Sequence, residues 1–181
     1  MEYLHHYDSP LGTLFLSSDG FAITGSWFED QKYVPEHIKK QTTESHLPVF
    51  DQAIEWLTLY FSGNEPTFLP PLSFQTTPFR KSVLEILRKI PYGQTTTYRE
   101  ISNQIAQQRH INSMSAQAVG GAVGHNPLSL FIPCHRVIGS NGNLTGYAGG
   151  LHRKIELLKL EGVDVSILSG SSRSQTAQPK E

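Results

Sequence analysis

The chain has 181 residues, of which 38% are hydrophobic and 17% charged, a composition typical of a folded globular protein and not of a disordered one. The formal net charge is −1, but residues 1–73 hold 10 acidic and 3 basic side chains and residues 74–165 hold 5 and 10, so any polyanion is expected to bind the second region. Short apolar runs and the lack of a secretory signal exclude a membrane protein and predict a cytoplasmic one. The single cysteine, Cys134, excludes an internal disulfide and a Cys-based zinc cluster, so no metal is expected.

Residues 1–73 are predicted to form a small α/β lobe. Asp19-Gly20 is a hairpin-turn sequence between two β-type runs, and the apolar spacing of residues 48–61 predicts one helix, which Gly63 ends. Three prolines within residues 63–73 disfavour both helix and central strand, so this segment is interpreted as a linker. The β-type runs, which indicate an antiparallel sheet, are residues 2–7, 12–16 and 21–28.

Residues 74–165 are predicted to form a second, winged-helix-like lobe, which makes the chain α+β. Thr77-Pro78 begins a helix that continues to residue 90, and Thr97 with Glu100 forms a capping box for a helix over 98–107. A third helix, rich in small residues, is expected over 113–124 with Ser113 as its cap. Two helices joined by a short turn in a basic lobe indicate a helix-turn-helix.

The remaining segments surround the cysteine. Residues 128–132 are a continuous apolar run that fits a short buried strand, and Cys134 lies at its exit. Residues 139–150 hold five glycines and are expected to form a loop able to bring backbone donors close to a ligand. A final helix is predicted over 151–161, and the polar tail, residues 166–181, is expected to be disordered.

The segment Pro-Cys-His-Arg-Val at residues 133–137 carries the strongest chemical signal. A thiol attacks carbon as the thiolate; its reference pKa is about 8.5, and a neighbouring imidazole or guanidinium lowers that pKa. Here His135 and Arg136 follow Cys134 directly. On an extended chain adjacent side chains point to opposite sides, so His135 need not touch the sulfur and can act through a water. A buried structural cysteine and the nucleophile of a cysteine hydrolase are the alternatives that these residues leave open.

An ordered set of motifs around this segment resembles the O6-alkylguanine-DNA alkyltransferases, also called methylated-DNA–protein-cysteine methyltransferases. The similarity covers about residues 76–162, and the first lobe is only loosely similar. The resemblance implies a ribonuclease-H-like first lobe. The matching segments are Pro91-Tyr92-Gly93, Tyr98, Ala118-Val119-Gly120-Gly121, Asn126-Pro127, Pro133-Cys134-His135-Arg136-Val137, Gly146-Tyr147-Ala148-Gly149-Gly150 and Glu161-Gly162.

The resemblance implies catalytic roles for four residues. Cys134 matches the alkyl acceptor, and His135 matches the base that draws the thiol proton through a bound water. Glu161 matches the carboxylate that orients this imidazole, and Asn126 matches a residue that ties the helix-turn-helix to the active site by hydrogen bonds. The alternatives are a solvated helix residue for Glu161 and an ordinary turn for Asn126. A carboxylate in a last helical turn opposes the helix dipole at a cost of about 0.3–1 kcal/mol, which a role beyond surface charge would explain.

The resemblance also implies a pocket for a guanine flipped out of the duplex. Tyr98 matches a hydroxyl that donates to guanine N3. Tyr147 and Ala148 lie where the family offers backbone N–H groups to O6. The main-chain carbonyls of Cys134 and Val137 match acceptors for the guanine amino group.

Further matches concern the DNA itself. Ser140 matches a contact to the DNA backbone, and Gly120 allows close approach of the second helix of the helix-turn-helix, which the family places in the minor groove. Gln117 departs from the family pattern, because many members insert an arginine there to replace the flipped nucleotide. Weaker DNA affinity, with the chemistry retained, is therefore expected.

The activity that the resemblance implies is a single-turnover DNA repair. An alkyl group passes irreversibly from O6 of guanine, and from O4 of thymine, in double-stranded DNA to Cys134, without metal or organic cofactor. The protein is expected to be a monomer, at the nucleoid in a prokaryote and in the nucleus in a eukaryote. A cysteine hydrolase and a non-catalytic module that binds damaged DNA remain the alternatives.

Overall fold

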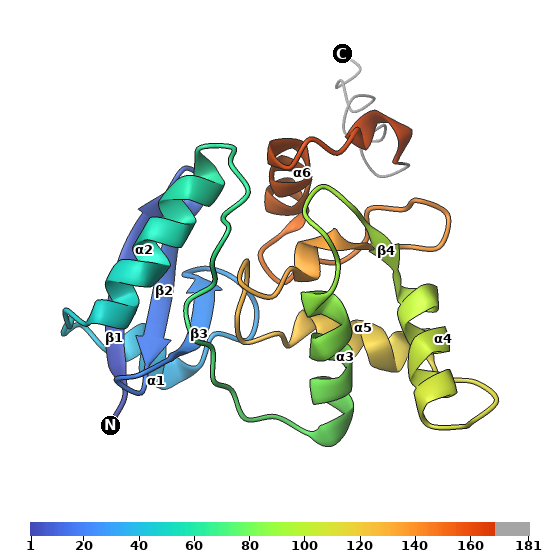
Figure 1. Cartoon of the computed structure of the whole chain (residues 1–181), viewed down its shortest axis with the longest axis horizontal. Helices are drawn as coiled ribbons and strands as arrows, with labels where there is room; N and C mark the ends of the chain where they lie inside the picture. The colour runs from blue at the N-terminus through green and yellow to red at the C-terminus, as the bar shows by residue number, and fades with distance from the viewer. Residues whose placement is uncertain (169–181) are drawn as a thin grey trace, which may run out of the picture. The chain divides into compact units, whose positions relative to one another are not determined.

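The computed structural model describes residues 1–168, which divide into two compact units. Unit 1 comprises Met1–Thr76 and His125–Ile132, and unit 2 comprises Thr77–Gly124 and the chain from Pro133 onward. The predicted α+β fold is confirmed (Figure 1). Residues 125–132 group with the first unit, although the sequence places them inside the second lobe. None of the helices in residues 1–168 has the length and apolar character that crossing a membrane requires.

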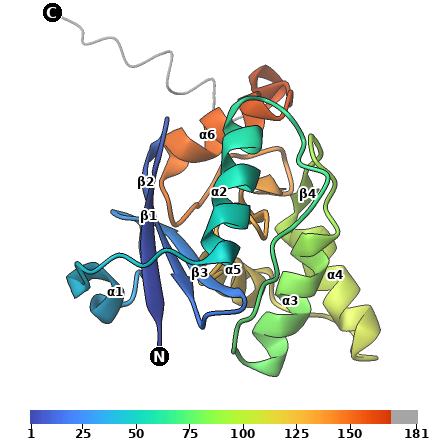
Figure 2. The ribbon, with the colours of Figure 1, turned by 60° about the vertical axis from the view of Figure 1, so that its left-hand side comes forward.

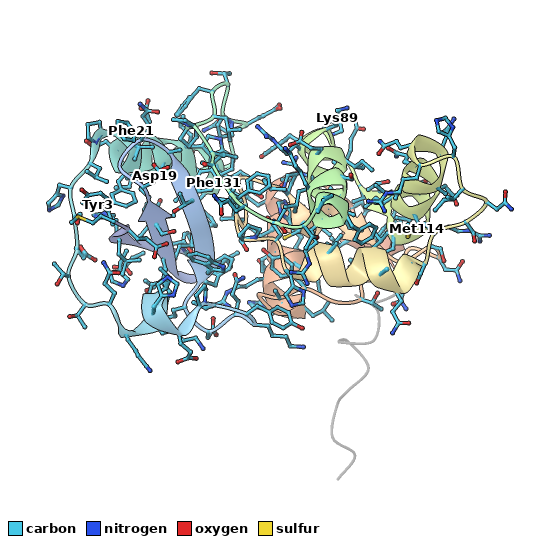
Figure 3. All side chains as sticks on the ribbon, turned by 90° about the horizontal axis from the view of Figure 1, so that it is seen from below. Tyr3, Asp19, Phe21, Lys89, Met114 and Phe131 are labelled. Carbon is cyan, nitrogen blue, oxygen red and sulfur yellow. The ribbon has the colours of Figure 1, made fainter. Side chains whose placement is uncertain are left out.

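Unit 1 is built on a three-stranded antiparallel sheet in the order β1-β2-β3. The predicted turn at Asp19-Gly20 joins the second and third strands: Asp19 Oδ1 accepts the backbone N–H groups of Phe21 and Ala22, each at 2.9 Å (Figure 3). Gly20 has φ +104°, which favours glycine. The strands are β1, Tyr3–Ser9; β2, Gly12–Ser18; and β3, Ile23–Phe28.

Two segments distant in sequence pair with the outer edge of β3. Ile23 N–H donates to the Pro71 carbonyl, and Ser26 N–H donates to the Pro127 carbonyl, both at 2.8 Å. The end of the predicted linker is therefore part of the sheet. These two segments pair with backbone groups of the edge strand that would otherwise be open to another chain.

The buried strand predicted over residues 128–132 is not formed. These residues are all buried, but they make isolated bridges only, and Ile132 N–H donates back to the Leu128 carbonyl at 2.9 Å. Leu130 has φ +75°, which turns the chain. An apolar run fixes burial and not backbone conformation, so the segment satisfies its backbone groups by a turn and by contacts to β3.

Two helices complete unit 1. α2, Pro48–Phe61, lies along one face of the sheet and contacts all three strands (Figures 1 and 2). α1, Glu36–Lys40, was not expected, because five residues carry too little periodicity to predict a helix. Its buried Ile38 joins an apolar cluster whose other members are Leu4, Trp27 and Val34.

Unit 2 is mainly helical, and its first two helices start at the predicted caps. The Thr77 side chain accepts Arg80 N–H at 3.3 Å, and the capping box of Thr97 and Glu100 is present. The elements are α3, Pro78–Arg88; β4, Thr96–Thr97; α4, Tyr98–Gln108; α5, Ala116–Gly124; η1, Cys134–Arg136; β5, Val137–Ile138; α6, Leu151–Leu160; and η2, Val165–Ile167.

The helix-turn-helix of α4 and α5 has a long connection of seven residues, 109–115, where three or four are usual. The connection contains Met114 (Figure 3). The cap of α5 is Ser115 and not Ser113: its hydroxyl accepts Ala118 N–H at 3.2 Å. Both serines fit the cap preference, and only the position of the helix distinguishes them.

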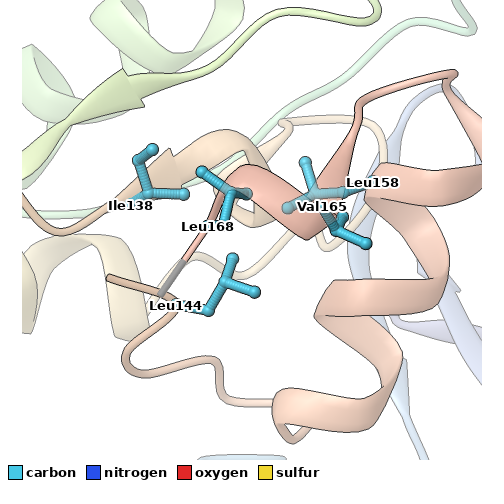
Figure 4. Close-up of a cluster of buried hydrophobic side chains, with 5 residues drawn as sticks. All are labelled: Ile138, Leu144, Leu158, Val165 and Leu168. Carbon is cyan, nitrogen blue, oxygen red and sulfur yellow. The ribbon is translucent and has the colours of Figure 1, made fainter. Parts of the chain in front are cut away.

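The end of the described chain packs into unit 2 (Figure 4). The tail predicted to be disordered from residue 166 is therefore too long, since η2 includes Ser166 and the Leu168 side chain is only 7% exposed. The prediction followed the polar composition of the tail and gave too little weight to the apolar residues Ile167 and Leu168. The rest of the tail, 169–181, lies outside the described residues. The cluster consists of Ile138, Leu144, Leu158, Val165 and Leu168.

Candidate active site

Cys134 opens η1 and is 5% exposed. The turn is closed by Arg136 N–H donating to the Pro133 carbonyl at 3.1 Å and by Val137 N–H donating to the Cys134 carbonyl. The extended backbone assumed at this point from the sequence is thus wrong. A buried segment must pair its backbone groups, and a single 3-10 turn does so within five residues.

Glu161, the C-cap residue of α6, is the centre of a buried polar network in unit 2. Its Oε2 lies 2.5 Å from His135 Nε2. Its Oε1 accepts Arg136 Nε at 2.7 Å and Gly93 N–H at 2.9 Å. Arg136 Nη1 also donates to the Ile90 carbonyl at 2.7 Å. The sequence singled out His135 and Glu161, which do meet. It considered Arg136 only as a charge beside Cys134, and it did not predict the bond from Arg136 or from Gly93 to this carboxylate.

The electrostatics of the network hold the carboxylate ionised and the imidazole neutral. Burial alone would raise the pKa of Glu161, but the hydrogen bonds and charges of His135 and Arg136 outweigh it and lower that pKa to about 2. Burial lowers the pKa of His135, against the opposing effect of Glu161. A neutral imidazole whose Nε2–H donates to a carboxylate carries its lone pair on Nδ1. His135 is therefore able to accept a proton through Nδ1.

Gly93 is required by the geometry of this network. Its φ is +77°, and a Cβ at this position would lie 3.0 Å from the Glu161 carbonyl oxygen. The preceding Tyr92 donates its hydroxyl to the Leu160 carbonyl at 3.4 Å, and the Arg136 guanidinium lies 5.7 Å from the centre of its ring. The Pro-Tyr-Gly turn is thus held against the end of α6.

Lys154 is a residue that the sequence reasoning missed. Its side chain on α6 is fully buried, and Nζ donates to the carbonyls of Thr145 and Gly146 at 3.1 and 3.0 Å. Nζ also lies 5.9 Å from the centre of the Tyr98 ring. Burial lowers the pKa of Lys154 to about 8, and the charge of Cys134 acts in the opposite direction. A signal existed: position 154 lies three residues before the buried Leu157, on the same helix face.

A cavity of about 660 Å³ lies between α4, α5 and the loop that follows β5. Three of the predicted site residues line it, namely Tyr98, Gly120 and Ser140. Tyr98 donates its hydroxyl to the Thr145 carbonyl at 3.3 Å, and burial raises its pKa to about 12, with Cys134 adding to the shift. Gly146, with φ +67°, also lines the cavity. These residues form a concave surface in unit 2 with the helix-turn-helix on one side.

The other predicted residues are placed as follows. Gln117 is exposed on α5, Val137 is buried in β5, and Ala148 is half-buried. Asn126 is a residue of unit 1, where it is 4% exposed; its Nδ2 donates to the Ile132 carbonyl at 2.8 Å and its Oδ1 accepts Leu128 N–H at 3.0 Å. Asn126 thus fixes the segment that leads, two residues later, to the cysteine.

Comparison with known proteins gives matches over nearly all of the described chain. Residues 3–74 match the ribonuclease-like domain of 6-O-methylguanine DNA methyltransferase, and residues 78–163 match the DNA-binding domain of the same family. A relative from Haemophilus influenzae, named methylated-DNA–protein-cysteine methyltransferase, is 41% identical over 160 residues, which cover 88% of this chain and 86% of the relative. One of the same name from Mycobacterium tuberculosis H37Rv is 40% identical over 86% of this chain and 92% of its own.

Solved structures agree with this assignment. The crystal structure of O6-methylguanine methyltransferase from Mycobacterium tuberculosis is similar with a TM-score of 0.75 at 39% identity, over 89% of this chain and 93% of that one. A crystal structure of the same organism's protein in complex with DNA also has a TM-score of 0.75, at 37% identity over 92% of this chain and 98% of that one.

Proposed function

Because the chain belongs to the 6-O-methylguanine DNA methyltransferase family, we propose that it repairs DNA by moving an alkyl group from O6 of guanine to the sulfur of Cys134. O4 of thymine is a second proposed donor. The observation that carries the proposal is the buried turn in which Cys134 is followed by a neutral His135 bonded to the Glu161 carboxylate. This arrangement supplies a nucleophile, a base and an orienting group in one fixed unit.

The proposed reaction is an in-line displacement at the alkyl carbon. His135 accepts the thiol proton through a water, and Glu161 holds the imidazole in the tautomer that carries its lone pair on Nδ1. The carbon–sulfur bond forms as the carbon–O6 bond breaks, and the electron pair passes to the guanine ring, which takes up a proton. The product is a thioether, whose carbon–sulfur bond neither water nor another thiol cleaves, so each molecule reacts once.

The guanine is proposed to leave with its developing negative charge stabilised by donors. These are the Tyr98 hydroxyl toward N3 and the backbone N–H groups of Tyr147 and Ala148 toward O6. The carbonyls of Cys134 and Val137 would accept the guanine amino group. Since a base inside the stack is out of reach, the nucleotide has to be flipped out of the duplex.

DNA is proposed to bind unit 2, the basic part of the chain, through the helix-turn-helix of α4 and α5. Gly120 permits close approach to the minor groove, and Ser140 contacts a phosphate. Gln117 fills the gap left by the flipped base without adding a charge, so affinity is lower than with arginine. Asn126 keeps the segment before Cys134 in place. The protein is proposed to act as a monomer in the cytoplasm, at the nucleoid or, in a eukaryote, in the nucleus.

The test uses a duplex containing one O6-methylguanine and mass spectrometry of the protein. We expect one methyl group per molecule, located on Cys134, and no further turnover in excess substrate. Cys134→Ser should bind the duplex and accept no methyl group. Transfer to the Cys134→Ser protein, or repeated turnover on an ester or amide, would contradict the proposal and favour a different nucleophile or a hydrolase.

A further inference from the structure

The Thr145 carbonyl accepts hydrogen bonds from two side chains of unit 2 at once. The Tyr98 hydroxyl donates to it at 3.3 Å, and the buried Lys154 ammonium donates to it at 3.1 Å. Lys154 Nζ also donates to the next carbonyl along the chain, that of Gly146, at 3.0 Å. Because a carbonyl oxygen has two lone pairs, the Thr145 carbonyl can lose one of its donors and keep the other.

The two bonds to this carbonyl differ in strength. O–H···O bonds are usually about 2.7–2.8 Å long, so the Tyr98 bond at 3.3 Å is long and weak, whereas the Lys154 bond has an ordinary length for an N–H donor. Lys154 is also fixed in place, because its side chain is fully buried on α6 and bonds two neighbouring carbonyls. The tyrosine is therefore the donor that can leave.

The Tyr98 hydroxyl lies at the wall of the 660 Å³ cavity. Tyr98, Thr145 and Gly146 all line this cavity, and a Cβ at Gly146 would lie 3.7 Å from the hydroxyl oxygen. Burial raises the pKa of Tyr98 to about 12, so the hydroxyl keeps its proton and can donate to a base that enters. Such a base displaces water from the cavity, so a carbonyl that loses its protein donor there cannot bond water instead.

We propose that Lys154 is a positioning residue that releases the Tyr98 hydroxyl to the flipped guanine. The inference rests on the proposed function, in which this hydroxyl donates to guanine N3. To do so, the hydroxyl has to give up the Thr145 carbonyl, and Lys154 keeps that carbonyl paired during the exchange. Without the ammonium, the carbonyl would be left unpaired in a site closed to water, which favours the state in which Tyr98 stays bonded to it.

The test is a double-mutant cycle of Lys154→Met and Tyr98→Phe. The readout is the single-turnover rate of methyl transfer from a duplex with one O6-methylguanine, at saturating duplex concentration so that weaker binding does not enter. Because Tyr98→Phe leaves no hydroxyl to release, the two substitutions should be coupled. We expect Lys154→Met to slow transfer about tenfold in the wild-type background and about threefold or less in the Tyr98→Phe background.

Arg153→Met is the matched control. Arg153 Nη1 donates to the Gly149 carbonyl at 3.0 Å, so this substitution also removes an α6 side chain that holds the loop, but it leaves both donors of the Thr145 carbonyl in place. It should slow transfer by the same factor in both backgrounds. If the Tm shows that Lys154→Met does not fold, Lys154→Gln takes its place, since its side chain is uncharged and shorter, and the same coupling is expected.

An effect of Lys154→Met that is equal in the two backgrounds would overturn the inference, because the lysine would then only hold the loop. A Tyr98→Phe protein that reacts as fast as the wild type would overturn it as well, since the hydroxyl would have no role to be released for. Both outcomes leave alkyl transfer to Cys134 intact. A wild type that transfers no methyl group would instead refute the proposed function.

Discussion

The Glu161 network and the loop at residues 145–150 are both held by α6, but they differ in how completely their polar groups are paired. In the network both carboxylate oxygens have partners, and the adjacent guanidinium has two. In the loop a buried ammonium bonds two carbonyls, while a buried hydroxyl has no partner among residues 1–168. The comparison shows that both oxygens of the Glu161 carboxylate are paired in the network, whereas the loop keeps a buried hydroxyl without a partner among residues 1–168.

Glu161→Gln should break the Glu161 network and have the largest effect on stability. The neutral amide has one acceptor oxygen where the carboxylate has two, so it cannot accept hydrogen bonds from both His135 and Arg136 in the same way. It also leaves the buried guanidinium without a counter-charge. We expect the free energy of unfolding to fall by about 3–5 kcal/mol. Urea denaturation measures this change.

Glu156→Gln is the control for that substitution, on the same helix. Glu156 is a half-buried ion-pair partner of Lys159 at 3.7 Å, with a side chain that is 39% exposed, so its loss should change the free energy of unfolding by no more than about 1 kcal/mol. If the two substitutions changed the free energy of unfolding equally, the buried network would stabilise the protein no more than an ordinary charged residue on α6 does.

The acid dependence of stability should follow from the same pair. Both folded pKa values are depressed, so each residue contributes stability that is present above its unfolded pKa and is lost as the pH falls: below about 6.5 for His135, and between 4.5 and about 2 for Glu161. Where one proton separates the two states, the slope is about 1.4 kcal/mol per pH unit. The free energy of unfolding, measured by urea denaturation from pH 7 to pH 3, should fall more steeply with decreasing pH in the acid part of this range. In Glu161→Gln the dependence of this free energy on pH should be weaker below pH 4.5. A wild type whose stability is constant over this range would disprove the assignment of charges.

Lys154→Met should act on the loop at residues 145–150 and have the smallest effect on stability. The variant loses two hydrogen bonds to loop carbonyls, but it also removes a buried charge, so the two changes in unfolding free energy partly offset. The rate of alkyl transfer should fall about tenfold, because the loop is less well positioned. Single-turnover rates and amide hydrogen exchange at residues 145–148 measure both effects. Lys159→Met, an exposed change on the same helix, should leave the exchange rates as they are; if it alters them equally, the loop is not held by Lys154.

Local sequence signals predicted the elements well where a few neighbouring residues decide. The hairpin at Asp19-Gly20 and the capping box of Thr97 and Glu100 depend on bonds within three residues, and both are present. Ser113 failed as a cap because Ser115 has the same chemistry two residues later. Positions of similar propensity are distinguished only by how the helix packs.

The candidate site was predictable in its residues but not in its contacts. The motif around Cys134 identified His135 and Glu161, whose meeting across 26 residues the resemblance implied. Nothing local could indicate that Arg136 bonds the Ile90 carbonyl, 46 residues away. Lys154 was overlooked because lysine is normally exposed, although helical periodicity put it on the buried face.

The apolar cluster of Figure 4 has a consequence for how short a functional version of this chain can be. Similarity to the family's DNA-binding domain ends at residue 163, but Val165 and Leu168 pack with Ile138, the residue after Val137 in β5. A fragment cut at the edge of the similarity would uncover the strand that leaves the cysteine turn. The end of an expression fragment, or a fusion junction, therefore belongs after Leu168.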